Sequence, residues 1–398
     1  MTNYKLTALA AAIAGNLMVA SAVQANTSYT FNEAPYLPGQ LSIPSATFND
    51  NINVINNSNV YAGLALGWYT NNSGHNAGFI SNPATHTSQE FVGAALGDAS
   101  NAITGLGNNG QFVQQSLVLP SGASGQYTNS NGVGEGAEGL YFSSATATPV
   151  VVQDQLSGYI IGVGITGAPA YSSYVTGVSD NLNGGSSYNP QVLGWAEDPN
   201  ANTTIFDYNV NAKSYTTVLD STNLSGTPIS NASAGSVNSA AISSNGEYIV
   251  VDWSDNTSGD EWGALYNTLT HSWANFGGSN AFEVPASAGN GGTFITGVNN
   301  SGEVVGWYYS SAGYSGFAYS IANQAFLNDK IDAPSSLNAT NILGVNDKGV
   351  LVGYGNTIHS SYLATPNSVS AVPLPAAGWL MLSSLLGVNW LGRRKKAA

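Results

Sequence analysis

The chain has no cysteine and very few charged residues. Only 8 % of its 398 residues are Asp, Glu, Lys or Arg, where about a quarter is usual in globular domains. The lack of cysteine excludes disulfide cross-links and thiolate chemistry. So little charge is also typical of some disordered chains, but 21 Tyr, 12 Phe and 8 Trp supply the apolar surface that a packed core needs. We therefore expect a folded protein rich in turns.

Positive charge is especially scarce, and half of it lies at the carboxyl terminus. Arg393, Arg394, Lys395 and Lys396 are four of the eight cationic residues. Residues 26–371 contain three lysines and all 22 acidic residues, which gives this segment a net charge of −19. Binding to nucleic acid through phosphates needs clustered Lys and Arg, so no nucleic-acid partner is expected. Such a negative segment is also repelled by an anionic membrane surface.

The amino terminus has the pattern of a secretory signal peptide. Lys5 precedes an apolar run over residues 6–22, and residues 23–25 supply a small-residue cleavage site. We expect residues 1–25 to be removed on export, so that the mature chain begins at Asn26. A retained amino-terminal membrane anchor is the alternative.

Three ordered elements form the carboxyl terminus. The motif Val372-Pro373-Leu374-Pro375-Ala376 is followed by an uncharged apolar span over residues 376–392 and then by the four basic residues. This span is at the short limit for a transmembrane helix, roughly 17–25 residues, and the basic end is expected to stay cytoplasmic. A plain membrane anchor is one interpretation of this pattern.

The same elements resemble the PEP-CTERM sorting signal of Gram-negative bacteria, in a form that has Leu374 where the commoner motif has Glu. We assign residues 367–398 to this signal. The resemblance implies an exosortase-type enzyme as partner, a transient stay in the inner membrane, and removal of the tail. The protein would then be released from the cell or attached to its surface.

A repeat fills the rest of the chain. The clearest copy is Ile295-Thr-Gly-Val-Asn-Asn-Ser-Gly-Glu-Val-Val-Gly-Trp-Tyr308, and good or partial copies cover residues 342–354 and 241–253. Weaker copies begin near residues 54, 103 and 174. Each copy predicts two strands joined by a tight turn, with Gly246, Gly302 and Gly349 in left-handed conformations. In addition, Gly306 and Gly353, inside strands, predict a bulge or a close backbone approach.

These units resemble the extracellular repeats of the HAF family, whose pattern is close to Gly-Ile-Asn-x-x-Gly-x-Val-Val-Gly-Tyr followed by Gly-Phe-x-Tyr. Four short strands in roughly 50 residues are typical of a propeller blade. We therefore predict an all-β, β-propeller-like domain of six or seven blades over residues 54–366. Residues 26–53 are a separate segment whose Ser28–Phe31 stretch could close the ring. A pair of β-sandwiches or a β-solenoid are alternatives.

No catalytic motif is apparent. The four histidines are scattered without metal-ligand spacing, and no nucleophile elbow occurs. The acidic pairs Glu135/Glu138 and Glu197/Asp198 are weak candidates for glycosidase chemistry. The oxygen ligands and turn glycine of the densest acidic cluster suit calcium, although its spacing is not that of an EF-hand and a solvated loop is the alternative. This cluster consists of Asp252, Asp255, Asp260 and Glu261.

Tryptophans are the remaining candidates. Four of them fall at one repeat position and are expected to pack between blades, with a ring of sugar-stacking platforms as the alternative; they are Trp68, Trp195, Trp253 and Trp307. Trp262 and Trp273 lie outside that register, and we take them as candidate ligand contacts.

The sequence as a whole favours an exported, non-enzymatic surface protein of the extracellular matrix or biofilm. Its expected partners are extracellular polysaccharide or other surface proteins. No cofactor is expected, and calcium is the one alternative. The rival interpretation is a propeller glycosidase or lyase that acts on exopolysaccharide. A purely structural matrix component without a ligand is the third.

Overall fold

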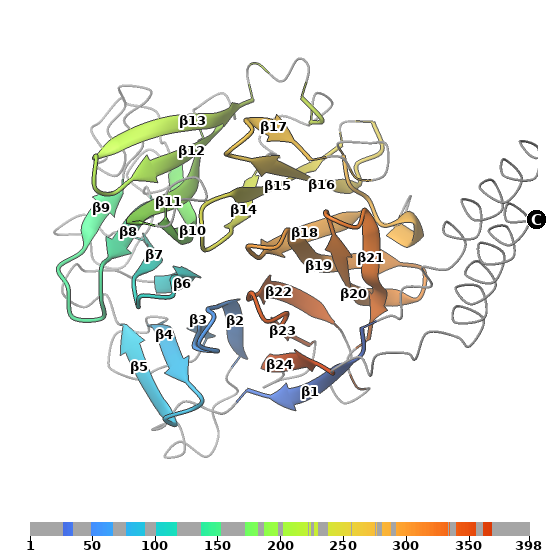
Figure 1. The fold of residues 1–398 in the computed structure, drawn as a ribbon, viewed down its shortest axis with the longest axis horizontal. Coiled ribbons are helices and arrows are strands. Elements are labelled where there is room, and N and C mark those ends of the chain that lie inside the picture. Colours follow the sequence, from blue (N-terminus) through green and yellow to red (C-terminus); the bar gives the residue numbers. More distant parts are fainter. Residues whose placement is uncertain are drawn as a thin grey trace, which may run out of the picture. The chain divides into compact units, whose positions relative to one another are not determined.

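The computed structural model of the protein describes the greater part of residues 27–367 (Figure 1). The described ranges are 27–34, 49–66, 77–91, 101–117, 137–152, 172–181, 187–197, 202–221, 223, 227–229, 238–255, 257–274, 276, 281–287, 292–332, 334, 340–355 and 361–367. The expected signal peptide and the sorting motif, apolar span and basic end lie outside these residues. Tyr29–Pro366 form one compact unit.

Six four-stranded antiparallel sheets surround a common centre, so the expected all-β propeller is confirmed, with six blades (Figure 1). The first three blades are as follows. Blade 1 contains β2 (Asn49–Ile55), β3 (Tyr61–Leu66), β4 (Ala77–Asn82) and β5 (Thr87–Phe91). Blade 2 contains β6 (Asn101–Leu106), β7 (Phe112–Leu117), β8 (Ala137–Phe142) and β9 (Val150–Val152). Blade 3 contains β10 (Ser172–Asn181), β11 (Tyr188–Glu197), β12 (Thr203–Asn209) and β13 (Ser214–Asp220).

The other three blades follow the same order, and a short 3-10 helix, Pro285–Ser287, precedes the fifth. Blade 4 contains β14 (Asn238–Ile242), β15 (Tyr248–Ser254), β16 (Glu261–Asn267) and β17 (Ser272–Trp273). Blade 5 contains β18 (Thr293–Val298), β19 (Glu303–Ser310), β20 (Gly313–Ser320) and β21 (Ala325–Ile331). Blade 6 contains β22 (Asn341–Val345), β23 (Leu351–Tyr354), β24 (Ser361–Pro366) and, at its outer edge, β1 (Tyr29–Glu33). Blade 6 therefore combines strands from both ends of the domain.

Hydrophobic packing joins each blade to the next. The described residues form six buried clusters, and each contains side chains from two neighbouring sheets. Between blades 4 and 5, for example, Val250 and Leu265 pack with Ile295 and Phe317. The ring is thus held by blade-to-blade burial of apolar surface rather than by one central core.

The repeat glycines behave as the sequence predicts. Gly246, Gly302 and Gly349 have φ angles of 74°, 71° and 72° in the turns between the first two strands of their blades. At Gly306, a Cβ would overlap the carbonyl oxygen of Phe294, which explains glycine by close backbone approach. Gly353 meets the carbonyl oxygen of Asn341 in the same way.

One bulge recurs in the innermost strand of every blade. In β18 the register shifts between Ile295 and Gly297, which leaves Thr296 as the extra residue. The equivalent extra residues of the other blades are Asn53, Thr104, Thr176, Ala240 and Leu343. Because the bulge turns the strand, it determines which side chains of the innermost strand face the central channel of the propeller on either side of the bulge.

The repeat asparagine ties its own turn to the next blade. Asn346, which is 3 % exposed, accepts hydrogen bonds from the backbone N–H groups of Lys348 and Val350 at 3.0 Å each. Its amide donates to the carbonyl oxygen of Asn56, 3.0 Å away in blade 1. Asn56 in turn donates to the carbonyl oxygen of Gly107 in blade 2.

Blade 2 lacks this asparagine and replaces it from a different position. Gly107 stands where the other repeats have Asn or Ser, and the side chain of Gln111 occupies the space beside it. Gln111 donates to the carboxylate of Asp180 in blade 3. A glutamine four residues later in the chain therefore bonds to the next blade, as the repeat asparagine does in blades 1, 5 and 6.

A closed circle of hydrogen bonds runs through the six turns. Each blade donates a backbone N–H to an oxygen of the blade that follows it, and the sixth donates to the first. The bonds are Asn57 N to Asn108 Oδ1 (2.8 Å), Asn108 N to Asp180 Oδ1 (3.0 Å), Asp180 N to Ser244 O (2.7 Å), Asn245 N to Asn300 Oδ1 (2.8 Å), Asn300 N to Asp347 Oδ1 (2.8 Å) and Asp347 N to Asn57 Oδ1 (2.8 Å). We call this end of the channel the turn end. The channel there has a volume of about 70 Å³.

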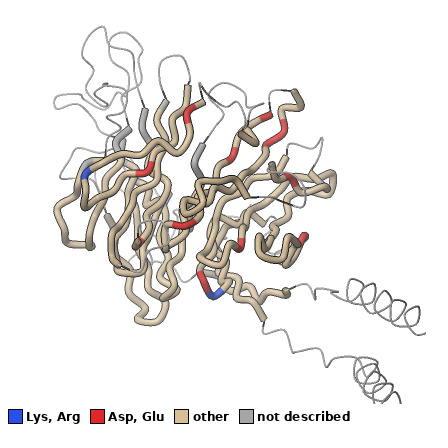
Figure 2. The backbone as a smooth tube through the Cα atoms, turned by 45° about the horizontal axis from the view of Figure 1, so that its top comes forward, with Lys and Arg blue, Asp and Glu red and all other residues tan. Residues whose placement is uncertain are grey.

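The charge of the ring is mostly negative. Acidic positions lie on several blades of the described backbone, and basic positions are few (Figure 2). The described residues include no helix long and apolar enough to cross a bilayer.

Asn346→Ala should lower the free energy of unfolding by about 2–4 kcal/mol, because one buried and one partly buried N–H group lose their acceptor and the link to blade 1 is cut. Chemical denaturation with tryptophan fluorescence measures the change. Asn211→Ala, at an exposed asparagine bonded to Asn189, is the matched control and should change stability by no more than about 0.5 kcal/mol. Equal effects of the two variants would contradict the role of the asparagine in joining blades.

Candidate functional site

A cavity of about 280 Å³ lies at the other end of the channel, which we call the loop end. Blade 5 provides its aromatic wall and blade 4 provides a carboxyl group. Its lining residues are Asn53, Thr104, Thr176, Asp252, Phe294, Ile295, Thr296, Trp307 and Leu343. An apolar wall with a few converging polar groups is typical of sites for small ligands.

The floor of the cavity is formed by the bulge residues. The hydroxyl of Thr296 donates to the carbonyl oxygen of Ile342 at 2.6 Å, and that of Thr104 donates to the carbonyl oxygen of Val175 at 2.7 Å. Asn53 bonds to the carbonyl oxygen of Ile103 in the same way. Each of these side chains is fixed by the neighbouring blade, so the floor is rigid.

Two stacked aromatic pairs occupy the same position in blades 5 and 3, and the blade 5 pair lines the cavity. Phe294 and Trp307 lie with their ring centroids 4.0 Å apart and their planes at 13°, and Tyr174 and Trp195 lie 4.3 Å apart at 21°. Both pairs join the first two strands of a blade, two residues before the bulge. Sequence reasoning missed Phe294 and Tyr174, although an aromatic residue two places before Thr-Gly-Val would have identified both.

Asp252 occupies the matching position in blade 4. It pairs with Asn238, as Trp307 pairs with Phe294 and Trp195 with Tyr174. Its neighbour Trp253 points to the opposite face of the sheet and is 2 % exposed in the core between blades 3 and 4. The sequence alignment of the repeats placed Trp253 at the position of Trp195 and Trp307. This was wrong by one residue, because the strand register puts Asp252 at that position.

The environment of Asp252 favours its neutral form. Burial and, to a lesser extent, the negative charge of Glu261 together raise the pKa of this carboxyl to about 7. Glu261 lies on the adjacent strand and accepts a hydrogen bond from the hydroxyl of Ser254. The only salt bridge between described residues joins Lys330 to Asp332, so neither carboxyl group has a described cationic partner.

The other two members of the acidic cluster lie in the loop after β15. The carboxylate of Asp255 accepts from the backbone N–H groups of Thr257 and Ser258, at 2.8 and 2.7 Å. Glu283 joins this region, where burial and then the charges of Asp260 and Asp255 raise its pKa. The described residues contain no group of three or more His, Asp or Glu side chains arranged to hold a metal ion.

Trp262 and Trp273, the predicted ligand contacts, are both partly buried. They pack against the hydrophobic cluster between blades 3 and 4, and Trp273 meets Tyr266 edge to face at 5.2 Å. The indole Nε1 of Trp262 is buried without a hydrogen-bond partner among the described residues. Neither tryptophan lines the cavity at the loop end.

The remaining sequence candidates fall outside the described side chains. These are Trp68 and the acidic pairs Glu135/Glu138 and Glu197/Asp198. A second buried carboxyl, Asp207, bonds to Gln191 within blade 3 and does not line the cavity.

No protein-family model and no curated protein matches the chain. Among solved structures it is similar to TolB from Acinetobacter baumannii (10 % identity, TM-score 0.40, 71 % of this chain and 53 % of that one). It is also similar to a Hadza microbial sialidase, with 10 % identity and a TM-score of 0.47 over 80 % of this chain and 66 % of that one. A third similar structure is the β-propeller domain of the Trilobed protease from Pyrococcus furiosus, with 8 % identity and a TM-score of 0.37 over 80 % of this chain and 95 % of that one. The chain thus spans 53 % of TolB and 66 % of the sialidase. At these identities the comparisons concern the fold alone.

The variant Glu261→Gln should lower the pKa of Asp252, because it removes a neighbouring negative charge. Carboxyl-carbon NMR should place the midpoint of Asp252 near pH 7 in the native protein and at lower pH in the variant. Asp207 is the internal control: its pKa is about 7 through burial, with no contribution from Glu261, and should not move. An unchanged Asp252 midpoint would show that the two carboxyl groups do not interact.

The same shift predicts a stability effect of known sign. The folded protein holds the Asp252 proton more tightly than the unfolded chain, so its contribution to stability decreases as the pH rises from about 4 to about 7. Asp252→Asn should lose only this share of the decrease, because Asp207 also has a pKa of about 7 and contributes in the same direction. Chemical denaturation of both proteins at pH 4 and pH 7 measures the difference.

Proposed function

We propose that the protein is an exported, non-enzymatic surface protein that binds carbohydrate at the loop end of its channel. The observation that carries this proposal is the cavity that is lined by both the Phe294–Trp307 stack and Asp252. The electron-rich face of an aromatic ring attracts the positively polarised C–H groups on the face of a sugar ring. Carboxyl and amide groups beside the rings can bond to sugar hydroxyls.

The charge of the domain narrows the ligand class. Lys213, Lys330 and Lys348 are the only cationic residues between positions 26 and 371, and none of them lines the cavity. Anionic ligands such as nucleotides or phosphorylated peptides would meet repulsion at this site. Neutral or cationic carbohydrate agrees better with the acidic surroundings.

The termini support delivery to the outside of the cell. The signal-peptide pattern of residues 1–25 and the sorting-signal pattern of residues 367–398 agree with export followed by exosortase-type processing. A matrix or biofilm polysaccharide is then a ligand that the protein would meet. Calcium held by Asp252, Asp255, Asp260 and Glu261 is a weaker proposal, because Asp255 is already engaged by its own loop.

A glycosidase or lyase is the second candidate. Asp252 with a pKa of about 7 beside the carboxyl of Glu261 resembles the combination of general acid and carboxylate that glycoside hydrolysis needs. This is the one observation that favours an enzyme over a binding protein.

The native protein should retain polysaccharide from its own host without releasing reducing ends, and Trp307→Ala should weaken that binding at least about tenfold, since a central aromatic contact is worth roughly 2 kcal/mol or more. Isothermal titration and a reducing-end assay measure the two quantities. Trp273→Ala, which removes a tryptophan away from the cavity, is the control and should bind normally.

Release of reducing ends would instead establish the enzyme. Loss of binding in Trp273→Ala alone would move the site away from the channel, and no binding at all would favour the purely structural interpretation.

Mature protein recovered from the cell surface or medium should begin near Asn26 and lack the basic residues 393–396. Mass spectrometry of both ends determines this. Replacing Pro373 and Pro375 with Ala should leave the tail uncut and the protein in the inner membrane, whereas Pro366→Ala is the matched control outside the motif. A mature native chain that ends at Ala398 would refute the sorting proposal.

A further inference from the structure

An aromatic row extends from the cavity to the surface of blade 5. Phe294 stacks on Trp307, Trp307 lies 5.5 Å from Tyr314, and Tyr314 lies 4.8 Å from Tyr309, all between ring centroids. Phe294 and Trp307 line the cavity, whereas Tyr309 and Tyr314 are each 41 % exposed. These four residues form what we call the blade 5 row. It offers continuous ring surface from the cavity to the exposed edge of the blade.

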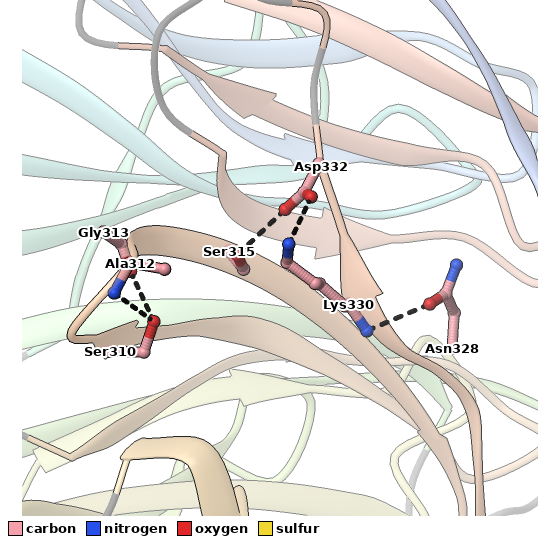
Figure 3. A network of polar contacts seen from close by, with 7 residues as sticks. All are labelled: Ser310, Ala312, Gly313, Ser315, Asn328, Lys330 and Asp332. Carbon is pink, nitrogen blue, oxygen red and sulfur yellow. Dashed lines mark hydrogen bonds and ion pairs between the residues drawn. The ribbon is translucent and has the colours of Figure 1, made fainter.

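The hairpin that carries the outer part of this row is well fixed. Ser310 Oγ donates to the carbonyl oxygen of Gly313 at 3.1 Å and accepts from the backbone N–H of Ala312 at 3.3 Å (Figure 3). Tyr309 and Tyr314 are direct cross-strand partners immediately before and after this turn. Their rings are therefore presented on a rigid strand pair rather than on a free loop.

The only positive charge on blade 5 is neutralised. Lys330 forms a 2.9 Å ion pair with Asp332, which also accepts a hydrogen bond from Ser315 (Figure 3). Ser315 follows Tyr314 in β20, so its side chain points to the opposite face of the sheet. The blade 5 row thus contains no cationic group, and its inner end lies at the carboxyl of Asp252 with Glu261 next to it.

We infer that the site takes a linear polysaccharide that carries protonated amino groups, with one amino sugar at the carboxyl of Asp252 and the following sugars along the blade 5 row. This inference rests on the proposed function and specifies its ligand class. An ammonium group beside Asp252 offsets the burial of this carboxyl and favours its ionised form, to which it bonds strongly. The ammonium group is also attracted to the faces of Trp and Tyr. An N-acetylated sugar lacks the charge and would leave the Asp252–Glu261 pair without a counter-ion.

Direct binding of three hexasaccharides that differ only at carbon 2 tests this inference. The probes are the β-1,4-linked hexamers of glucosamine, N-acetylglucosamine and glucose, titrated into the full mature protein at low salt. The glucosamine hexamer should bind at least about tenfold more tightly than the other two, and this preference should weaken in high salt. In Asp252→Asn the preference for the glucosamine hexamer over the glucose hexamer should decrease at least about fivefold.

The blade 5 row is tested by chain length. Tyr314→Ala and Tyr309→Ala should weaken binding of the glucosamine hexamer several-fold and leave binding of the dimer unchanged. Tyr188→Ala, at another exposed tyrosine, is the matched control and should bind both normally. Equal loss for dimer and hexamer, or no loss for either, would overturn the row as a track.

Failures of the two proposals are distinguishable. If all three hexamers bind equally and Trp307→Ala weakens all of them, the preference for amino sugars is wrong and carbohydrate binding stands. If none of these hexamers nor the host polysaccharide binds, both proposals fail.

Discussion

The circle of hydrogen bonds at the turn end is the interaction on which the rest of the structure depends. Each blade alone is a four-stranded sheet with two apolar faces, and neither face is covered until a neighbour packs on it. Apolar packing is not directional, so it does not by itself set how far one blade rotates against the next. The bonds from Asn346 to Asn56 and from Asp347 to Asn57 do so, because they join fixed backbone positions across the point where the chain closes.

This constraint explains which features of the fold could be predicted from the sequence. The asparagine and the turn glycine recur because a backbone hydrogen bond and a positive φ each require a particular residue type, as at Asn299 and Gly302. Local chemistry of this kind is visible in a single repeat. The number of blades is not visible in a single repeat, because it depends on the angle between neighbouring sheets. The replacement of the repeat asparagine by Gln111 in blade 2 is likewise visible only in three dimensions.

The candidate site was harder to predict, and the reason is the register of the second strand. In blade 4 the pattern Val-Val-Asp-Trp253 places an aspartate where blades 3 and 5 have tryptophan, so alignment by tryptophan displaces the strand by one residue. A shift of one residue exchanges the two faces of a strand, so this alignment puts Trp253, which packs in the core between blades as expected, in the register of Trp195 and Trp307. The carboxyl in the channel was therefore noticed as part of an acidic loop, while its relation to Phe294 and Trp307 was not.

The two ends of the channel differ in how freely their residues can be substituted. Closure of the ring depends on residues of the turn end, whereas the cavity, the aromatic pairs and Asp252 lie beyond the bulges at the loop end. The bulge residues connect the two, because Thr104 and Thr296 bond to the next blade while lining the cavity floor. Substitutions above that floor are expected to change the lining of the cavity and leave the closure of the ring intact. The blades can therefore diverge at one end, as Asp252 and Trp307 have, while their turns remain nearly alike.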